Sequence, residues 1–452
     1  MPTHTLPNPQ AFPKDFVFGA ATSAYQIEGA VHADGRGLSM WDSFAHHSGR
    51  IADGSTGDVA CDHYHRMESD VALIQSLGHT AYRFSVAWPR VLPTGRGAVN
   101  TRGLDFYDRL VDQLLARGIT PYATLYHWDL PLTLHEQGGW LHRDTCRAFA
   151  DFAEVVARRL GDRVHSYATL NEPRCSATVG YLEGRHAPGL QDRGMALQAA
   201  HHLLLAHGLA VPALRAHTRS AQVGVVLDVK PYYAADSGAD TAHTVQMADG
   251  VFNRWFLDPL FKGHYPQDVW VAEQGHQPLV QDGDLATICQ PLDALGLNYY
   301  TRGHVVHDAT LPFPHARELP VAGASYTTMG WEVFAEGLRQ MLVRIHQEYA
   351  PQRLYVAENG AALDDSVVDG RVHDPLRVRY LQEHLQACAQ ALAQGVPLQA
   401  WLGWSLMDNY EWGKGYTQRF GLCHVDYATQ TRTPKDSALW LRDFIAQHAR
   451  AR

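Results

Sequence analysis

Two glutamates each follow an apolar run directly, Glu172 in the segment TLNEP and Glu358 in VAENG. A carboxylate in such a position lies at the rim of a hydrophobic core, where burial raises its pKa, and a second carboxylate nearby raises the pKa of one of the pair further. One carboxyl group can then stay protonated near neutral pH while the other is ionised. Cleavage of a glycosidic bond uses this division of roles: one group protonates the leaving oxygen, and the other attacks the anomeric carbon or activates water. The alternative is that both glutamates only form ion pairs.

Aromatic and polar residues around these glutamates favour the chemical interpretation. The C–H faces of a sugar ring pack on flat aromatic surfaces, and we expect such surfaces from Trp128, Tyr300, Trp331, Trp404 and Trp412. The hydroxyl groups of a sugar need directed polar partners, and the suitable candidates are Gln26, His127, Asn171 and Glu411. Any single tryptophan could instead belong to the core, as we expect for Trp401 and Trp440. The segment 404–422 departs from helix and strand periodicity, which is typical of a rigid binding loop.

The elements that must position these residues alternate between short apolar runs and amphipathic helical patterns. Such alternation predicts parallel strands joined by right-handed crossovers, and eight repeats indicate an α/β fold of the closed (β/α)8 TIM-barrel type, as a single domain over residues 1–452. Residues 1–14 are expected to be an N-terminal extension. The main alternative is an open doubly wound sheet, but no G-x-G-x-x-G or Walker-type loop follows an early strand. The predicted strands are Phe16–Ala21, Ala81–Ala87, Pro121–Tyr126, Ser166–Leu170, Val223–Leu227, Ala294–Tyr299, Leu354–Ala357 and Leu398–Trp404.

The segments between the predicted strands support the barrel prediction. Apolar residues from Leu104 to Leu115 predict one helix, which ends at Arg117-Gly118, and those from Phe149 to Leu160 predict another, which ends at Gly161. In a TIM barrel the chemistry lies on the loops after the strands, and the candidate residues above cluster there. Trp88 also follows the second strand, whereas the fifth strand offers no residue that can be assigned. Two long connections, 48–62 and 307–328, are expected to wall the mouth of the site.

Composition excludes several classes of partner. The chain has 38 Lys and Arg against 47 Asp and Glu, so its net charge is 38 − 47 = −9, and it has no basic run. We therefore expect no binding to nucleic acid or to an anionic membrane surface. The N-terminus has no apolar segment of signal-peptide type, and no apolar stretch is long enough to cross a membrane. The six cysteines are scattered without a CxxC pair, which favours a reducing compartment, and we expect a cytoplasmic protein.

Two rival functions are weighed against the glycosidase interpretation. His63-Tyr64-His65 is an HxH pattern of the kind found in metal-dependent barrel hydrolases, but it follows a loop and begins a helical stretch, so we expect a structural role. The second rival is a non-catalytic sugar-binding relative that has lost turnover. Such a protein would typically lack one of the two glutamates, and both are present here.

The sequence resembles glycoside hydrolase family 1, the β-glucosidase family, from about Phe16 to Phe444. The motifs that carry the resemblance occur in the order FVFGAATSAYQIEGA, CDHYHR, YRFSVAWPR, YHWDLP, TLNEP, NYY, VAENG and the 404–422 loop. Many members have Thr before the second glutamate, where this chain has Ala357. The resemblance implies a retaining, exo-acting enzyme without metal or cofactor. Its expected substrates are cellobiose, other short β-glucosides and aryl β-glucosides, and also β-galactosides and β-fucosides. The expected biological role is in the degradation of cellulose and other polysaccharides.

The same resemblance implies a role for each site residue. Glu172 looks like the acid/base and Glu358 like the nucleophile, with carboxyl groups about 5–5.5 Å apart, as retention requires. Asn171 is similar to the residue that holds the sugar 2-hydroxyl, while Arg83 and Tyr300 match residues that orient the nucleophile.

Gln26, His127, Trp128, Glu411 and Trp412 match residues that bind the other hydroxyls of the non-reducing sugar. Trp404 matches the stacking platform for that sugar, and Trp331 looks like the aromatic on the aglycone side. Phospho-β-glycosidases lack a carboxylate at the position of Glu411. A neutral sugar is therefore expected here, because the negative charge of Glu411 would repel a sugar phosphate. The acceptor can be water or, in transglycosylation, another sugar. The resemblance also suggests a monomer or a small homo-oligomer.

Overall fold

Eight parallel strands close into a barrel in this computed structural model, which describes residues 6–47 and 49–450. Around the barrel the strands follow the order β1-β11-β10-β7-β5-β4-β3-β2. Each overlaps one of the eight predicted strands, so the predicted (β/α)8 barrel is confirmed and the open doubly wound sheet was the wrong alternative. Their bounds are β1 Val17–Ala21, β2 Ala81–Ser85, β3 Thr120–Tyr126, β4 Ser166–Asn171, β5 Gln222–Asp228, β7 Ala294–Asn298, β10 Leu354–Asn359 and β11 Leu398–Trp404.

The strands are apolar throughout because both of their faces are covered. Side chains such as Phe18 and Leu170 point outward and pack with the helices in the main core. Side chains that point inward form a second buried cluster inside the barrel, in which small residues such as Ala21 and Ala168 alternate with larger ones such as Tyr122. This interior is filled, as in other barrels of eight strands, so a ligand can bind only at an open end.

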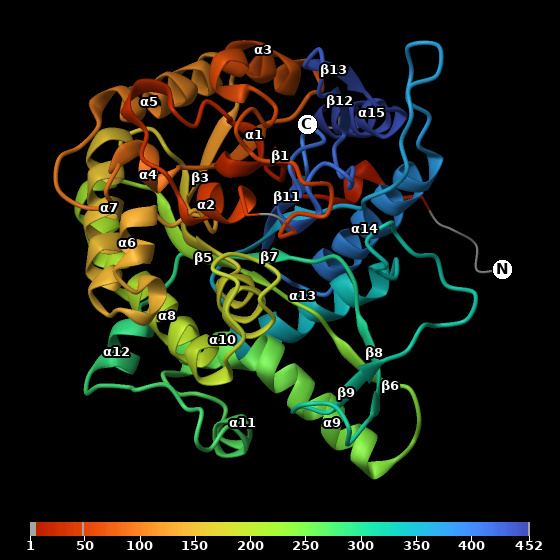
Figure 1. Ribbon diagram of the computed structural model, residues 1–452. Helices are drawn as coiled ribbons and strands as arrows, with labels where there is room; N and C mark the ends of the chain where they lie inside the picture. The colour runs from red at the N-terminus through yellow and green to blue at the C-terminus, as the bar shows by residue number, and fades with distance from the viewer. Residues whose placement is uncertain (1–5, 48, 451–452) are drawn as a thin grey trace.

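Helices surround the strands (Figure 1). The long ones are α3 His63–Ser76, α5 Thr101–Ala116, α7 Asp144–Leu160, α8 Arg193–His217, α9 Ala239–Asp249, α10 Trp255–Lys262, α13 Ala335–Tyr349, α14 Pro375–Ala393 and α15 Asp436–Arg450. The short ones are η1 Pro9–Ala11, α1 Ala24–Ile27, η2 Ala33–Gly35, α2 Met40–Ala45, α4 Trp88–Val91, α6 Leu132–Glu136, η3 Gly139–Leu141, η4 Cys175–Leu182, η5 Gly250–Arg254, α11 Gln267–Ala272, α12 Asp284–Ile288 and η6 Trp412–Lys414.

The two helices predicted from periodicity are α5 and α7, and both end where the sequence indicates. Leu104, Leu110 and Leu114 of α5 are buried as predicted, but Leu115 is 42% exposed, because it lies at the edge of the apolar stripe, beyond the reach of the barrel. Trp88 is fully buried and packs on Phe152 of α7, so it belongs to the core and not to the mouth of the barrel.

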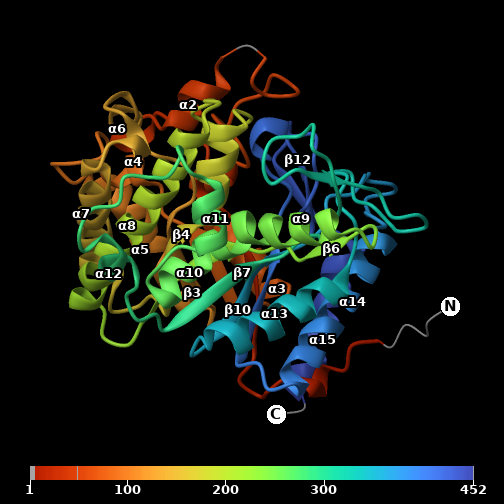
Figure 2. The ribbon, with the colours of Figure 1, turned by 90° about the horizontal axis from the view of Figure 1, so that it is seen from below.

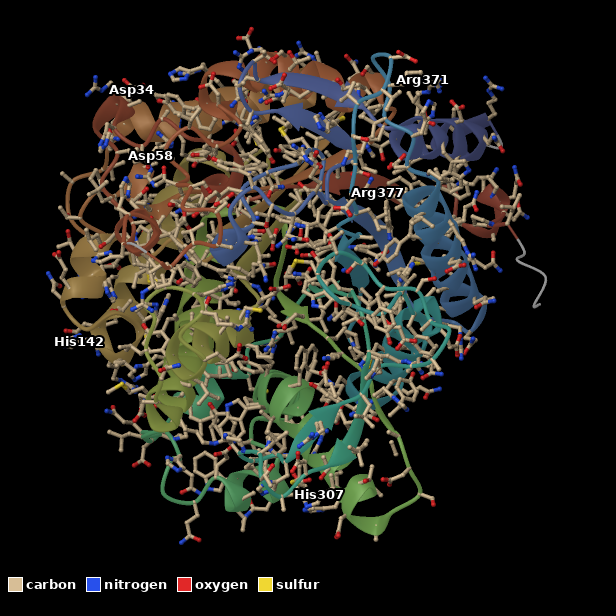
Figure 3. All side chains as sticks on the ribbon, turned by 45° about the vertical axis from the view of Figure 1, so that its right-hand side comes forward. Asp34, Asp58, His142, His307, Arg371 and Arg377 are labelled. Atoms are coloured by element: carbon tan, nitrogen blue, oxygen red, sulfur yellow. The ribbon has the colours of Figure 1, made fainter. Side chains whose placement is uncertain are left out.

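Two small sheets and the N-terminal segment lie outside the barrel. Strands β6 Tyr232–Ala234, β8 Gly303–His307 and β9 Ala316–Glu318 form one sheet beside α9 (Figure 2), and β12 Cys423–Asp426 pairs with β13 Thr431–Pro434. His307 lies near α9 (Figure 3), where its Nδ1 is 2.8 Å from the Thr244 hydroxyl.

Of the predicted extension 1–14, residues 1–5 lie outside the described part, while Pro9 and Phe12 are buried. The ring of Phe12 lies 6.0 Å from that of Phe444 in α15. Within residues 6–47 and 49–450, no helix combines the length and the apolar character that crossing a membrane requires.

Candidate active site

Glu172 and Glu358 lie at the carboxyl ends of β4 and β10 and line the same cavity, which has a volume of about 820 Å³. Strand pairing shifts register near both residues, between Ala168 and Asn171 and between Val356 and Glu358. Such irregularities re-aim side chains and are common beside active sites. Glu172 also has φ of +47°, an uncommon conformation for a residue with a Cβ, which indicates that the surrounding structure holds it in place.

Glu358 lies among groups that stabilise its ionised form. Arg83 Nη1 donates to its Oε1 at 2.6 Å, and the Tyr300 hydroxyl donates to its Oε2 at 2.7 Å. Burial raises the pKa of Glu358, but the Arg83 charge and these hydrogen bonds oppose that rise because they stabilise the ionised form. Both oxygens are thereby held in one orientation toward the cavity.

Glu172 has the opposite environment. Its Oε1 accepts a hydrogen bond from Asn298 Nδ2 at 2.7 Å, and the described structure gives it no ion pair with a cation. Burial raises its pKa well above the usual range, and the nearby carboxylates of Asp228 and Glu358 raise it further. Glu172 is therefore the member of the pair that keeps its proton, as a general acid must.

Asn171 lies between the two glutamates and is linked to Glu358 through Arg83 and to Glu172 through Asn298. Its Oδ1 accepts from Arg83 Nη2 at 2.6 Å and from Asn298 Nδ2 at 3.0 Å, and its Nδ2 lies 3.2 Å from His127 Nε2. Its backbone oxygen accepts from Trp128 Nε1 at 3.0 Å. The sequence places Asn298 at a predicted strand end, in the NYY motif, but gives it no role; in the structure it ends β7 and donates to Asn171 and Glu172.

Polar partners for sugar hydroxyls gather where β1 meets the loop after β11. Gln26 Nε2 donates to Asn409 Oδ1 at 2.9 Å and lies 3.4 Å from Glu411 Oε2. Burial, with a contribution from the Glu358 charge, raises the pKa of Glu411 to about 8. Glu411 is thus largely protonated in the free site at neutral pH. The charge argument against a sugar phosphate, which assumed an ionised Glu411, therefore holds only above that pH.

The aromatic residues form two groups of ring contacts, one around Trp404 and Trp412 and the other around Tyr300 and Trp331. The rings of His127 and Trp404 are stacked with centroids 5.7 Å apart, and Trp128 lies 4.6 Å from Trp412. Trp331 lies farther out, 5.2 Å from the Tyr300 ring. Nine of the twelve candidate residues line the cavity, whereas Gln26, Arg83 and Asn171 are buried behind that lining: the nine are His127, Trp128, Glu172, Tyr300, Trp331, Glu358, Trp404, Glu411 and Trp412.

The long connections wall this cavity as predicted, through Gly49, Arg50 and Ala52 on one side and Pro314 and Ala316 on another. Trp401 is buried in the core, where its Nε1 donates to Asn359 Oδ1. Trp440 is partly buried and packs against the core.

The HxH pattern does not form a pair of metal ligands. His63 is buried and its Nδ1 lies 2.8 Å from Asp70 Oδ2, whereas His65 is exposed and pairs with Asp62. The expected structural role of His63 agrees with this arrangement, because His63 ties the start of α3 to its second turn.

A set of possible ligand atoms does occur beside Glu172, where Glu172, Cys175 and Asp228 bring such atoms within 4.8 Å of one another. Arg174 Nε donates to Asp228 Oδ2 at 2.5 Å, so a cation already neutralises this carboxylate. Asp228 stands at the end of β5, where the sequence offered no assignable residue. Neither Asp228 nor Arg174 was anticipated from the sequence.

Comparison with known proteins agrees with this geometry. The profile of the family described as Glycosyl hydrolase family 1 matches residues 8–450. The chain belongs to glycosyl hydrolase family 1. It is therefore a retaining glycosidase.

Individual relatives support the same assignment. The chain is 46% identical to a β-glucosidase of Agrobacterium sp., over 96% of each chain. It is also 46% identical to a bifunctional β-D-glucosidase/β-D-fucosidase of Bifidobacterium breve, over 97% of this chain and 99% of that protein. Among solved structures, the family 1 β-glucosidase of Thermotoga maritima is similar with a TM-score of 0.94 and 42% identity, over 97% of this chain and 98% of that one.

Proposed function

We propose that this glycosidase releases single β-D-glucose units from short and aryl β-glucosides, with Glu358 as nucleophile and Glu172 as acid/base. The observation that carries the proposal is the asymmetry between the two carboxyl groups. Arg83 and Tyr300 stabilise the charge on Glu358, whereas Glu172 has Asn298 and a second carboxylate beside it. One group is thus prepared to attack and the other to donate a proton.

The reaction proceeds in two displacements at the anomeric carbon. Glu358 forms a bond to this carbon while Glu172 transfers its proton to the departing glycosidic oxygen, which leaves as the alcohol. Glu172, now ionised, removes a proton from water, and the resulting oxygen nucleophile displaces Glu358 from the same carbon. Two inversions give net retention, and the two carboxyl groups are expected to lie about 5–5.5 Å apart. General acid catalysis contributes about 10²–10⁴-fold.

The remaining residues bind the sugar. Trp404 offers its face to the ring, while Gln26, His127 and Glu411 surround the hydroxyls away from the anomeric carbon, and Asn171 takes the 2-hydroxyl. This pocket ends in the filled barrel interior, and such a closed end supports exo action. Trp331 and Tyr300, the second group of aromatic rings, lie toward the aglycone. Since a relative is named a glucosidase/fucosidase, we propose that β-fucosides and β-galactosides are also cleaved.

Proton NMR of the first minutes of hydrolysis tests the proposal, with an aryl β-D-glucoside at neutral pH in the presence of a chelator. We expect β-glucose first, which then equilibrates to the α anomer. Initial α-glucose would contradict the roles of Glu358 and Glu172. Loss of activity in chelator would favour the metal-dependent alternative. No release from the glucoside, the galactoside or the 6-phosphoglucoside would favour a sugar-binding protein without turnover.

We further propose a cytoplasmic enzyme that acts on cello-oligosaccharides left by cellulose and polysaccharide degradation. All six cysteines are free, which supports a reducing compartment. We propose small-molecule glycosides as its partners, without nucleic acid or membrane, and a monomer or small homo-oligomer as its assembly state. Size-exclusion chromatography with light scattering measures that state directly.

A further inference from the structure

The charged residues at the mouth of the cavity are not evenly balanced. On the side of β5, Arg174 pairs with Asp228 and Lys230 with Glu318, so these four charges cancel. The loops after β1 and β11 contribute Arg50, Lys414 and Glu411 to the cavity lining, and Glu411 accepts from Gln26 Nε2 in the sugar pocket. The neighbouring segment after η4 adds Arg185 and Glu183. Arg185 pairs with Glu183. Two cations therefore remain on this side.

Arg50 and Lys414 are both exposed, and among residues 6–47 and 49–450 neither has an ion-pair partner. The Arg50 guanidinium lies 5.2 Å from the centre of the Phe44 ring, and its side chain makes no hydrogen bond to another described residue. The two segments that carry these cations are joined, since Ala52 N donates to the oxygen of Gly413 at 2.9 Å. Asp53 of this loop accepts from Ser55 and from the Tyr416 amide and is not part of the cavity lining. We call Arg50 and Lys414 the cationic rim.

The opposite side of the mouth carries apolar side chains beside its two ion pairs. β1 and β5 stand four places apart in the closed order of eight strands, so the segments after β5 face those after β1 across the opening. They present a wall formed by Val229, Tyr232, Ala248, Val251 and Phe252. Trp331 and Met329 also line this cavity.

The path of the aglycone follows from the position of the proton donor. Glu172 must reach the glycosidic oxygen, so the leaving group begins beside Glu172 and extends outward past Cys175, Thr178 and Val179 of η4. An aglycone that continues outward lies between the apolar wall and the cationic rim. A ring in the aglycone would pack on the apolar wall, and an anionic substituent on the far side of that ring would bind the cationic rim.

We propose that the outer cavity selects β-glycosides whose aglycone carries a ring and, beyond it, a negatively charged group such as a carboxylate, which Arg50 and Lys414 bind. This selection concerns the leaving group and is compatible with a neutral sugar beside Glu411. It rests on the proposed glycosidase function, because the aglycone is defined by the bond that is cleaved.

Two substrates of equal shape test the proposal: 4-(carboxymethyl)phenyl β-D-glucoside and its amide, 4-(carbamoylmethyl)phenyl β-D-glucoside. The methylene group keeps the two leaving phenols similar in acidity. We expect kcat/KM for the acid to exceed that for the amide by about threefold to tenfold at low salt, since each exposed charge pair contributes up to about fivefold and two cations face one anion. The ratio should fall toward one near about 1 M salt, where screening is strong.

The double variant Arg50→Gln/Lys414→Gln is expected to bring the ratio to about one at low salt. The matched control is Lys14→Gln/Arg96→Gln, which removes the same two charge types from exposed positions outside the cavity lining and should keep the wild-type ratio. A wild-type ratio near one, or a ratio that survives in the rim variant, would overturn the inference. Failure to cleave even the amide would instead refute the proposed function.

Discussion

Asp228→Asn is the substitution that most directly tests how the acid is kept protonated. An oxygen of Asp228 lies within 4.8 Å of an oxygen of Glu172, and their repulsion is a cause, after burial, of the raised pKa of Glu172. Asparagine keeps the shape of the side chain but removes the negative charge. The pKa of Glu172 should therefore fall. Because the general acid acts in its protonated form, the basic limb of the kcat/KM profile should move to lower pH.

The distance gives the size of this effect. Two unit charges 4.8 Å apart repel with about 332/(20 × 4.8), or about 3.5 kcal/mol, at an effective dielectric constant of about 20, which corresponds to about 2.5 pH units. The Asp228 side chain is 10% exposed, so water reduces the repulsion. Glu358 and Arg83 remain in place, as does Arg174, whose attraction for Glu172 persists. We expect a downward shift of about one to two pH units.

The assay is kcat/KM between pH 5 and 9 with an alkyl β-glucoside, whose poor leaving group makes proton donation limiting. Arg174→Gln is the matched opposite change, because it leaves the Asp228 charge without its cation and should move the basic limb upward. Thermal unfolding of both variants shows whether the fold survives. An unmoved or raised basic limb in Asp228→Asn, with an intact fold, would refute this account of the acid.

Four further outcomes are expected. Glu358→Ala should nearly abolish turnover, and a variant that keeps a tenth of the wild-type rate would rule out Glu358 as the nucleophile. Glu172→Ala should slow the hydrolysis of substrates with poor leaving groups far more than that of activated aryl glycosides, and equal losses of rate would contradict the acid role of Glu172. Tyr300→Phe removes a charge-assisted hydrogen bond worth about 1.5–3 kcal/mol, so the pKa of Glu358 and the acidic limb of kcat/KM should rise by about one unit or more. Lys435→Met should reduce the free energy of unfolding by about 1–3 kcal/mol in denaturant titrations, because the buried carboxylates of Asp365 and Asp408 each lose one hydrogen-bonded cation. No measurable loss would show that the remaining partners, Arg377 and Arg419, are sufficient.

The barrel was predictable because its strands are covered on both faces. A run such as Leu398–Trp404 must be apolar along its whole length, and that pattern is visible without any knowledge of its neighbours. The carboxyl ends of parallel strands lie at the same end of a barrel. Glu172, Glu358 and Tyr300 follow such strands, so they could be placed together before the structure was known. Trp88 shows the limit of the argument, because a residue after a strand can equally turn back into the helix layer.

Asp228 and Arg174 could not be predicted because a pairing between charges depends on tertiary packing. Arg174 follows β4 and Asp228 ends β5, and only the closure of these neighbouring strands brings the guanidinium to the carboxylate. The local sequence VLDVK places Asp228 directly after an apolar run, as with Glu172 and Glu358, but it does not show which cation pairs with this aspartate. The same holds for Asn298, whose two hydrogen bonds go to residues more than a hundred positions earlier.

Glu411 shows why residue type alone does not define the chemistry of a site. As a residue type it suggests a fixed negative charge that repels phosphate, yet burial and the charge of Glu358 bring its pKa to about 8. A protonated carboxyl beside Gln26 can both donate to and accept from sugar hydroxyls, whereas the ionised form can only accept. A phosphate on the sugar would enter a buried pocket that already holds the ionised Glu358, and its dianion would keep Glu411 protonated at a further cost. Selection of a neutral sugar at neutral pH therefore follows from burial, with the charge of Glu411 adding to it only at higher pH.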